Sequence, residues 1–311
     1  MSYSSRIYMY GPVGLLLLIV VLYGVFWRVE SDTLAARLER ANGGNIMPGV
    51  AFSFAQKAVG GFPFRLDVLL SGVSFTYRSG ATEADWRVEH LALRRMAYGR
   101  NQFIFEADGK QSLAWKSSPD ASPETISLIP QVARASAILA DGRLVRFDVD
   151  IWAPRGTATN PKHISSEFSA TRAQLHVLGR RNKTVDFVMQ IENGRSGGSG
   201  PGAALPQIDC RAQLDHADVL TGLELGTEEP STALQNWRDN MGVINVSSLN
   251  LTWPDAHAML RGILTLDGQE RLAGVLRGDW SGKNHQTGPT ELRFDNGTFR
   301  FDDPVALQIQ H

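Results

Sequence analysis

The sequence predicts a mostly β protein. Repeated antiparallel β-hairpins are expected to form a curved sheet, as an open groove or a sandwich, with an N-terminal transmembrane helix and a few short helices. Three observations support this fold class. Apolar and polar residues alternate with a period of two in many short segments, which is typical of half-buried strands. One spacing of apolar residues recurs along the chain, and an uncharged apolar run lies near the N-terminus.

The apolar run from Ile7 to Trp27 contains no charged residue. About 20 apolar residues in a helix cross the hydrocarbon core of a bilayer, where a helix satisfies its own backbone groups. The segment Phe26 to Glu30 contains no small-residue cleavage site, which favours a retained anchor over a cleaved signal peptide. The basic residues around the run favour one pass, with the bulk of the chain outside the cytoplasm. Residues 1–28 are therefore expected to form the N-terminal segment and anchor.

A stalk helix is expected over residues 29–44. Ser31 is a residue type that caps helix N-termini, and Asp32 is favourable in a first turn. Gly43 and Gly44 are expected to end the helix. The apolar stripe is narrow, which favours a stalk continuing the membrane helix over a lid that packs on the following sheet.

Composition bounds the function. The 311 residues are 43% hydrophobic and 20% charged, as expected for a folded domain. The net charge of -1 gives no electrostatic footprint for nucleic acid. Cys210 is the single cysteine, so no intrachain disulfide can form, and its simplest role is that of a small buried hydrophobe.

The first strands are expected after Gly60. Phe62, Phe64, Leu66 and Val68 alternate with other residues, and the alternation resumes at Val73. This pattern predicts two strands or one long bent strand. Pro63 within it indicates a sheet edge or a strand start, because proline cannot donate to the ladder.

A repeat is the most informative pattern in the remaining chain. Apolar residues recur at relative positions 0, 2, 5 and 7, and the step from 2 to 5 changes strand parity, which indicates a β-bulge. Asp108-Gly109 and Asp267-Gly268 follow the first and last copies, and such dipeptides between apolar runs predict hairpin turns. A repeated β unit is therefore expected. The copies are Trp86, Val88, Leu91, Leu93; Phe168, Ala170, Ala173, Leu175; and Ile244, Val246, Leu249, Leu251.

Further strands are expected between the copies. A hairpin with Asp141-Gly142 at its turn joins Ala135–Leu139 to Leu144–Trp152, and residues 184–192 form another strand. The glycine-rich stretch 194–202 is a candidate boundary between a first β-repeat region, residues 45–195, and a second, residues 196–311. A surface insertion in one continuous sheet explains it equally well.

The C-terminal part contains a predicted helix and hairpin. Pro230 can start the helix, Gly242 can stop it, and Trp237 is expected to plug the core between helix and sheet. With Asn296-Gly297 as the turn, Phe294 faces Phe299, Leu292 faces Phe301 and Arg293 faces Arg300.

Catalytic motifs are missing from the sequence. It contains no nucleophile elbow, phosphate loop, dinucleotide fingerprint or zinc-type His/Glu motif. His216 and Asp218 are a weak metal signal, for which a polar strand edge is the simpler explanation. We therefore expect no enzyme activity, no cofactor, no metal site and no catalytic residue.

Several segments resemble a known bacterial family, catalogued as domain of unknown function 2125. They are Gly61–Leu66 after the membrane helix, Leu234–Asp239, Val246–Trp253, Gly262–Gly268 and Leu292–Phe301. The layout of an anchor and β repeats is also similar to that of the AsmA-like envelope proteins. That second resemblance is one of fold, and it implies a role in lipid traffic at the envelope of Gram-negative bacteria.

These observations lead to one functional hypothesis and one alternative. We expect a single-pass inner-membrane protein, with its bulk in the periplasm, that binds or guides a lipid or other hydrophobic envelope component. The alternative is a non-catalytic structural or adaptor protein that binds other envelope proteins, its two sheet faces closing on one another. The expected partners are the membrane, a lipid and envelope proteins, and not nucleic acid. The expected lipid-binding residues are Phe62, Phe64, Leu66, Val68, Leu260, Leu264 and Leu266.

Overall fold

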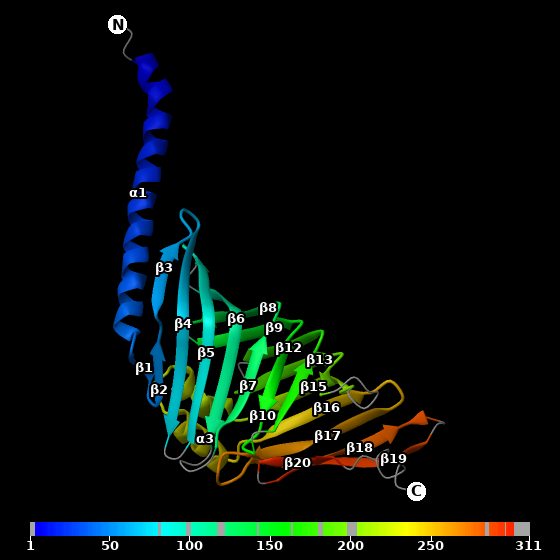
Figure 1. Cartoon of the computed structure of the whole chain (residues 1–311). Coiled ribbons are helices and arrows are strands. Elements are labelled where there is room, and N and C mark those ends of the chain that lie inside the picture. Colours follow the sequence, from blue (N-terminus) through cyan, green and yellow to red (C-terminus); the bar gives the residue numbers. More distant parts are fainter. Residues whose placement is uncertain are drawn as a thin grey trace.

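The computed structural model describes residues 4–79, 82–97, 101–116, 122–141, 143–162, 164–179, 183–197, 204–283, 286–295 and 297–301, with side chains from Leu18 onward. Within these ranges a long helix, α1 (Ser4–Ala41), projects from a curved, open antiparallel sheet (Figure 1). The short helices η2 (Ala217–Leu220), α2 (Thr221–Glu224) and α3 (Pro230–Asp239) lie beside the sheet, and we call them together the helical segment.

The strands that the structure describes belong to one hydrogen-bonded sheet. They are β1 (Gly44–Met47), β2 (Val50–Ser53), β3 (Gln56–Gly60), β4 (Arg65–Ser79), β5 (Thr82–Met96), β6 (Gln102–Lys116), β7 (Glu124–Ile129), β8 (Val132–Ala140), β9 (Arg143–Trp152), β10 (Arg155–Thr159), β11 (Ser165–Ser169), β12 (Arg172–Gly179), β13 (Val185–Glu192), β14 (Arg195–Ser196), β15 (Gln207–Leu214), β16 (Ile244–Thr252), β17 (His257–Leu266), β18 (Leu272–Ser281), β19 (Thr287–Asp295) and β20 (Thr298–Phe301).

The N-terminal helix is longer than the sequence predicts. α1 continues without interruption to Ala41, so Ser31 does not start a new helix and lies buried within α1. No glycine or proline separates Trp27 from Ser31, and the helix therefore has no reason to stop there. Its predicted end is confirmed, because Gly43 has a φ of 78°, which glycine adopts without strain.

The predicted membrane span lies partly outside the described side chains. Ile7 to Trp27 is helical, but nothing is described for the side chains of its first half, residues 4–17. Among the residues that are fully described, no helix has the length and apolar character of a membrane span.

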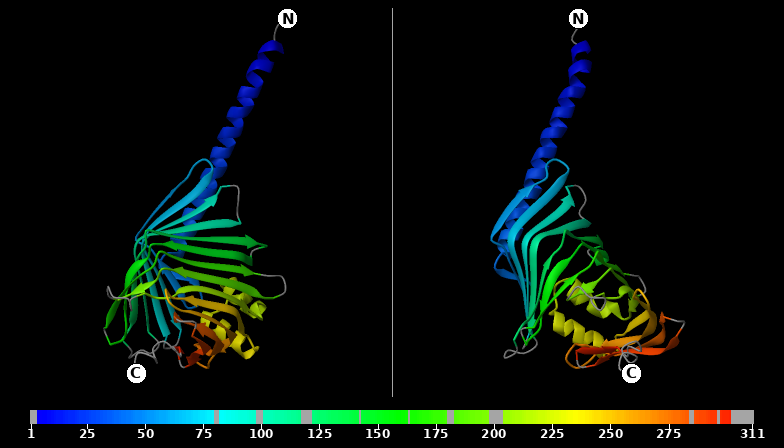
Figure 2. Two further views of the ribbon diagram at one scale, coloured as in Figure 1. Left: turned by 90° about the vertical axis from the view of Figure 1, so that its right-hand side faces the viewer. Right: turned by 45° about the vertical axis from the view of Figure 1, so that its right-hand side comes forward.

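The sheet divides at β6. One half of β6 pairs with β7, which continues through β10 and β11 to β14. The other half pairs with β8, which continues through β9, β12, β13, β15 and β16 to β20. Consecutive strands of the two branches, such as β9 and β10, are joined at corners only a few residues long. The sheet bends at these corners (Figure 2).

The repeated spacing is explained by irregularities in the strands. The register shifts between Val88 and His90 in β5 and between Val246 and Leu249 in β16, as the parity change predicts. The corner between β11 and β12 falls within the middle copy.

One predicted turn is wrong. Asp108-Gly109 lies inside β6 and not at a hairpin, with Gly109 at a φ of 77°. The amide of Lys110 donates to Oε2 of Glu89 at 3.0 Å, across the irregular part of β5. Asp267-Gly268 does lie between β17 and β18, where the Asp267 amide donates to the carbonyl of Arg271 at 2.8 Å.

Other predicted elements are confirmed. β4 is the single bent strand, with Pro63 in the turn before it and Gly72 at a φ of 62°. β8 and β9 form the predicted hairpin around Asp141, although Gly142 lies outside the described residues. β13 is the strand predicted over residues 184–192. β19 and β20 have the predicted register, although Asn296 lies outside the described residues.

The sheet is continuous where the glycine-rich stretch intervenes. β13 pairs directly with β15, so Ile191 lies opposite Ile208. Residues 198–202 of the stretch lie outside the described part. The division into two regions at residues 195 and 196 stays a prediction.

Buried clusters lie at both ends of the sheet. The N-terminal cluster includes Val68, Leu70 and Val88, and the half-buried Leu34 and Leu38 of α1 pack against it. The C-terminal cluster consists of residues from β16 to β19. Trp237 of α3 is 1% exposed, which confirms the predicted core plug, and its Nε1 donates to the carbonyl of Asp215 at 2.7 Å.

Candidate functional site

One face of the sheet is apolar across almost its whole width, and we call it the apolar face. Residues that lie directly opposite one another on neighbouring strands share a face, so the register identifies continuous rows. Two rows run from β4 to β17 or β18 without a polar side chain. The first is Val68, Leu93, Phe105, Ala135, Val149, Leu175, Met189, Cys210, Leu249 and Leu260; the second is Leu70, Leu91, Ala107, Ala133, Ile151, Ala173, Ile191, Ile208, Leu251, Ala258 and Trp280.

The two ends of the apolar face are covered and its middle is open. Val68 and Leu260 are fully buried in the two clusters. Between them, Val149 and Leu175 are only half-buried, and Met189 is 38% exposed. The middle of the face, from β8 to β15, is therefore an apolar surface that the described part of the sheet leaves open to another molecule.

The helical segment closes one side of this surface. A cavity of about 270 Å³ separates it from the strand ends and is lined by side chains of the apolar face together with Leu220 and Leu223. The segment also reaches the other end of the sheet, where the hydroxyls of Ser231 and Ser79 lie 2.8 Å apart. Figure 2 shows these helices close to the C-terminal strands. The sheet lining of the cavity includes Val145, Phe147, Val177 and Val185.

The residues predicted to bind lipid fall into two separate groups. Phe62, Phe64, Leu66 and Val68 lie in or just before β4, whereas Leu260, Leu264 and Leu266 lie in β17. Strands β5 to β16 separate the groups along the sheet. Phe62 and Phe64 are 55% and 65% exposed, Leu266 is half-buried, and the other four are buried. Their part in lipid binding stays a prediction.

Sequence reasoning did not single out the open middle of the face. Phe147, Val149 and Ile151 do show the alternation that places them on one side of a strand. These residues form one surface with β12, β13 and β15 only because those strands are neighbours in the sheet. The alternation within a single strand does not reveal which strands are neighbours.

The opposite face is polar, and most of its charges are paired. Glu106 accepts from Arg94 and Arg134, and Asp150 accepts two hydrogen bonds from Arg172, each of 2.8 Å. The Arg172 guanidinium and the indole of Trp152, both bonded to the Asp150 carboxyl, hold its pKa below the ordinary value against the effect of burial. This face is thus a solvated lattice of ion pairs.

A serine, a histidine and an aspartate lie in one row of the polar face. Ser71, His90 and Asp108 occupy opposing positions on β4, β5 and β6, and Ser71 Oγ lies 3.2 Å from His90 Nδ1. Hydrolysis by such a group also needs donors for an oxyanion. The nearby amides of Gly109 and Lys110 already donate to carboxylates. These two amides are therefore not available to stabilise an oxyanion beside the row.

The described residues contain no group of His, Cys, Asp and Glu side chains arranged to hold a metal. His216 has a φ of 56° just before η2, and Asp218 forms an ion pair with Lys183 at 2.7 Å. Cys210 is half-buried in the first row of the apolar face. Burial, and then the neighbouring Asp209 carboxylate, raises the pKa of its thiol.

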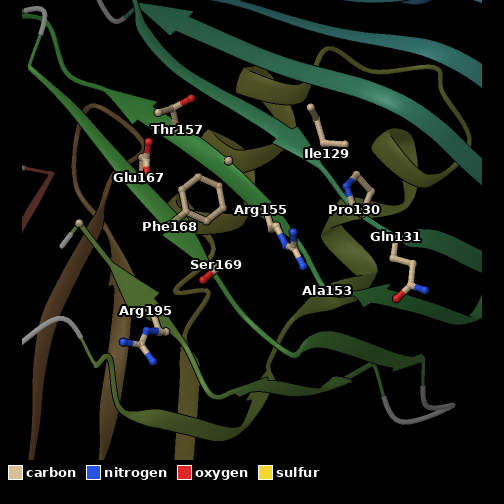
Figure 3. Close-up of a pocket in the computed structure, with 12 residues that line it drawn as sticks. Ile129, Pro130, Gln131, Ala153, Arg155, Thr157, Glu167, Phe168, Ser169 and Arg195 are labelled. Atoms are coloured by element: carbon tan, nitrogen blue, oxygen red, sulfur yellow. The ribbon is translucent and has the colours of Figure 1, made fainter. Parts of the chain in front are cut away.

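A further cavity lies at the corners where the sheet bends. Its volume is about 950 Å³, and its lining comes from β7, β10, β11, β14 and the corner residues (Figure 3). Arg155, Ser169 and Arg195 line it together with the ring of Phe168. Because Gly156 has no side chain, the Phe168 ring can lie over β10, where a Cβ at position 156 would be 2.8 Å from it.

Comparison with known proteins identifies the family. Searches of curated proteins and of solved structures gave no match. A family model described as "uncharacterized protein conserved in bacteria (DUF2125)" matches residues 27–278. The matched range runs from α1 into β18 and includes the helical segment. It bears out the resemblance seen in the sequence, although Leu292–Phe301 lies beyond it, and it does not test the likeness to AsmA-like proteins. The chain belongs to the DUF2125 family.

Proposed function

We propose that this protein binds a lipid or another hydrophobic molecule of the cell envelope on the apolar face of its sheet, while the N-terminal part of α1 anchors it in the inner membrane with the sheet in the periplasm. The observation that carries the proposal is the open middle of the apolar face. An exposed face of this extent on a soluble domain is unfavourable unless another molecule covers it. An acyl chain fits a surface whose rows contain no polar side chain.

The attachment of α1 to the sheet supports the membrane part of the proposal. Trp27, at the end of the predicted span, meets Phe62 edge-on with ring centroids 5.3 Å apart. Aromatic side chains are favourable at the level of lipid head groups. Phe62 and Phe64 are exposed beside the helix, so this end of the sheet would lie at the membrane surface, where lipid could enter.

Site-specific photocrosslinking in cells tests the proposal. Benzoylphenylalanine would replace Met189 in the middle of the apolar face of the full chain. Met259 provides the matched control, because it is 55% exposed and its neighbours Asn250 and Asp279 place it on the polar face. After irradiation, mass spectrometry identifies what is attached at each position. A lipid adduct at position 189 and none at 259 is the expected result.

The same experiment separates the alternative. A protein adduct at position 189 without lipid would favour the adaptor function. Equal lipid adducts at positions 189 and 259 would mean that membrane proximity alone causes crosslinking, and the proposed site would be rejected.

A further inference from the structure

We propose that the cavity at the corners of the sheet is a binding site for a phosphate group, with Arg155, Ser169 and Arg195 as its ligands. This site is on the polar side of the sheet and does not depend on lipid binding by the apolar face. Figure 3 shows the three residues on neighbouring strands of the cavity lining.

The register places the three residues in one row. Arg155 of β10 lies opposite Ser169 of β11, and Ser169 lies opposite Arg195 of β14. Neighbouring strands are about 4.8 Å apart, so the two arginine backbones are separated by about 10 Å. Two guanidinium groups at this separation can converge on one tetrahedral anion, while the serine hydroxyl between them donates a third hydrogen bond.

Several other arginines on the polar face are neutralised by carboxylates. Arg134, Arg146 and Arg172 each form an ion pair shorter than 3 Å with a carboxylate. Among the residues that the structure describes, neither Arg155 nor Arg195 forms an ion pair. Two uncompensated charges on one row make the potential of the cavity positive, and arginine is the side chain best suited to phosphate.

The rest of the lining defines the ligand further. Glu167 also lines the cavity and lies on the same side of β11 as Ser169. Its carboxylate therefore repels an anion bound there and weakens the binding. Ile129 lies opposite Arg155 and supplies an apolar contact, whereas Phe168 lies on the other side of β11. A ligand that combines a phosphate with an organic group therefore fits better than a ligand that is rich in carboxylates. The source of the phosphate is either a lipid head group or a soluble phosphate compound.

Titration calorimetry of the full chain in a maltoside detergent tests the site. The probes are inorganic phosphate and dihexanoyl phosphatidic acid, each titrated in phosphate-free buffer. Charged hydrogen bonds of this kind each change affinity by about tenfold or more. R155Q/R195Q should therefore lose binding of both probes, whereas E167Q should bind them more tightly. R87Q is the matched control, since Arg87 lies on the polar face outside this cavity, paired with Asp85 at 3.0 Å.

The outcomes are distinct. Similar affinity for both probes, lost in R155Q/R195Q and kept in R87Q, supports a site for the phosphate group alone. Tighter binding of phosphatidic acid with the same loss supports a lipid head group. If neither probe binds, or if R155Q/R195Q binds as the unmodified chain does, the proposal is overturned. Both arginines are exposed, and matching thermal unfolding of the variant and the parent shows that the fold is kept.

Discussion

Trp27 donates a hydrogen bond from Nε1 to the carbonyl oxygen of Arg65 at 2.7 Å, although 38 residues separate them in the chain. The hydroxyl of Tyr23 donates in the same way to the carbonyl of Pro63 at 2.6 Å. One turn further along α1, Glu30 forms an ion pair with Arg95 at 3.1 Å. The helix is thus fixed to the first strands of the sheet by successive contacts along one of its sides.

W27A should loosen this junction. The substitution removes the hydrogen bond to Arg65 and the ring contact with Phe62. A lost hydrogen bond of this kind costs about 1 kcal/mol, so opening of the junction should become about fivefold more frequent. Hydrogen exchange of peptides from β3 and β4, measured in detergent, should be faster. W253A is the control, because Trp253 stacks on Phe301 at the other end of the sheet. Unchanged exchange in W27A would show that these contacts do not hold the helix.

D150N should make the free energy of unfolding less dependent on pH than it is in the parent protein. The Arg172 hydrogen bonds lower the folded-state pKa of Asp150, so the unfolded carboxyl, with a pKa of about 3.9, binds protons more readily. Asp150 therefore stabilises the fold above that pKa, and the contribution is lost as the pH falls through the lower folded-state value. The free energy of unfolding of D150N should be lower than that of the parent by at most about 1 kcal/mol at pH 7, and the two should become equal in acid.

Denaturant unfolding at several pH values measures this effect. D141N is the control, since Asp141 is an exposed turn residue with a φ of 52°, a conformation that asparagine tolerates. A difference between D150N and the parent that stays constant from pH 7 to strong acid would contradict the assignment.

The limits of sequence reasoning are clearest where one dipeptide has two outcomes. Asp267-Gly268 forms a turn and Asp108-Gly109 forms an irregularity within β6, yet both lie between apolar alternations. Gly109 has a φ of 77°, whereas in the turn after β17 the residue with positive φ is Glu270, at 62°. A dipeptide that suits both structures does not select between them, and the choice depends on the partner strand. Glu89 accepts the Lys110 amide from that partner, a contact between residues 21 apart that no local pattern contains.

The candidate site likewise depends on contacts that a local sequence pattern does not contain. Local alternation predicts which side of each strand is apolar, and it correctly describes β9 and the β19–β20 register. The open surface depends instead on which strands adjoin and on what α1 and the helical segment cover. Arg155 and Arg195 lie 40 positions apart in the sequence, and only pairing through Ser169 brings them into one row.

Cys210 should report on occupation of the apolar face. Burial raises the pKa of its thiol, so at pH 8 less thiolate is present than in a free cysteine, and labelling by iodoacetamide should be slower. Met189 and Leu249 lie opposite it, so a ligand on this face should slow labelling further. Protein stripped of lipid by detergent washing should react faster than untreated protein. Equal rates before and after stripping would argue against a ligand beside Cys210.

G242A and W237F should be coupled through the packing of α3 on the sheet. A Cβ at position 242 would lie 2.2 Å from the Trp237 ring, so G242A forces the indole away from its place. Such overpacking costs about 1–3 kcal/mol. W237F alone loses core volume and the bond to the Asp215 carbonyl, but its smaller ring leaves space for the new methyl group. The double variant should therefore be less destabilised than the sum of the single variants, by about 0.5–3 kcal/mol in denaturant unfolding. Strict additivity would mean that Gly242 is required for its backbone and not for the approach of Trp237.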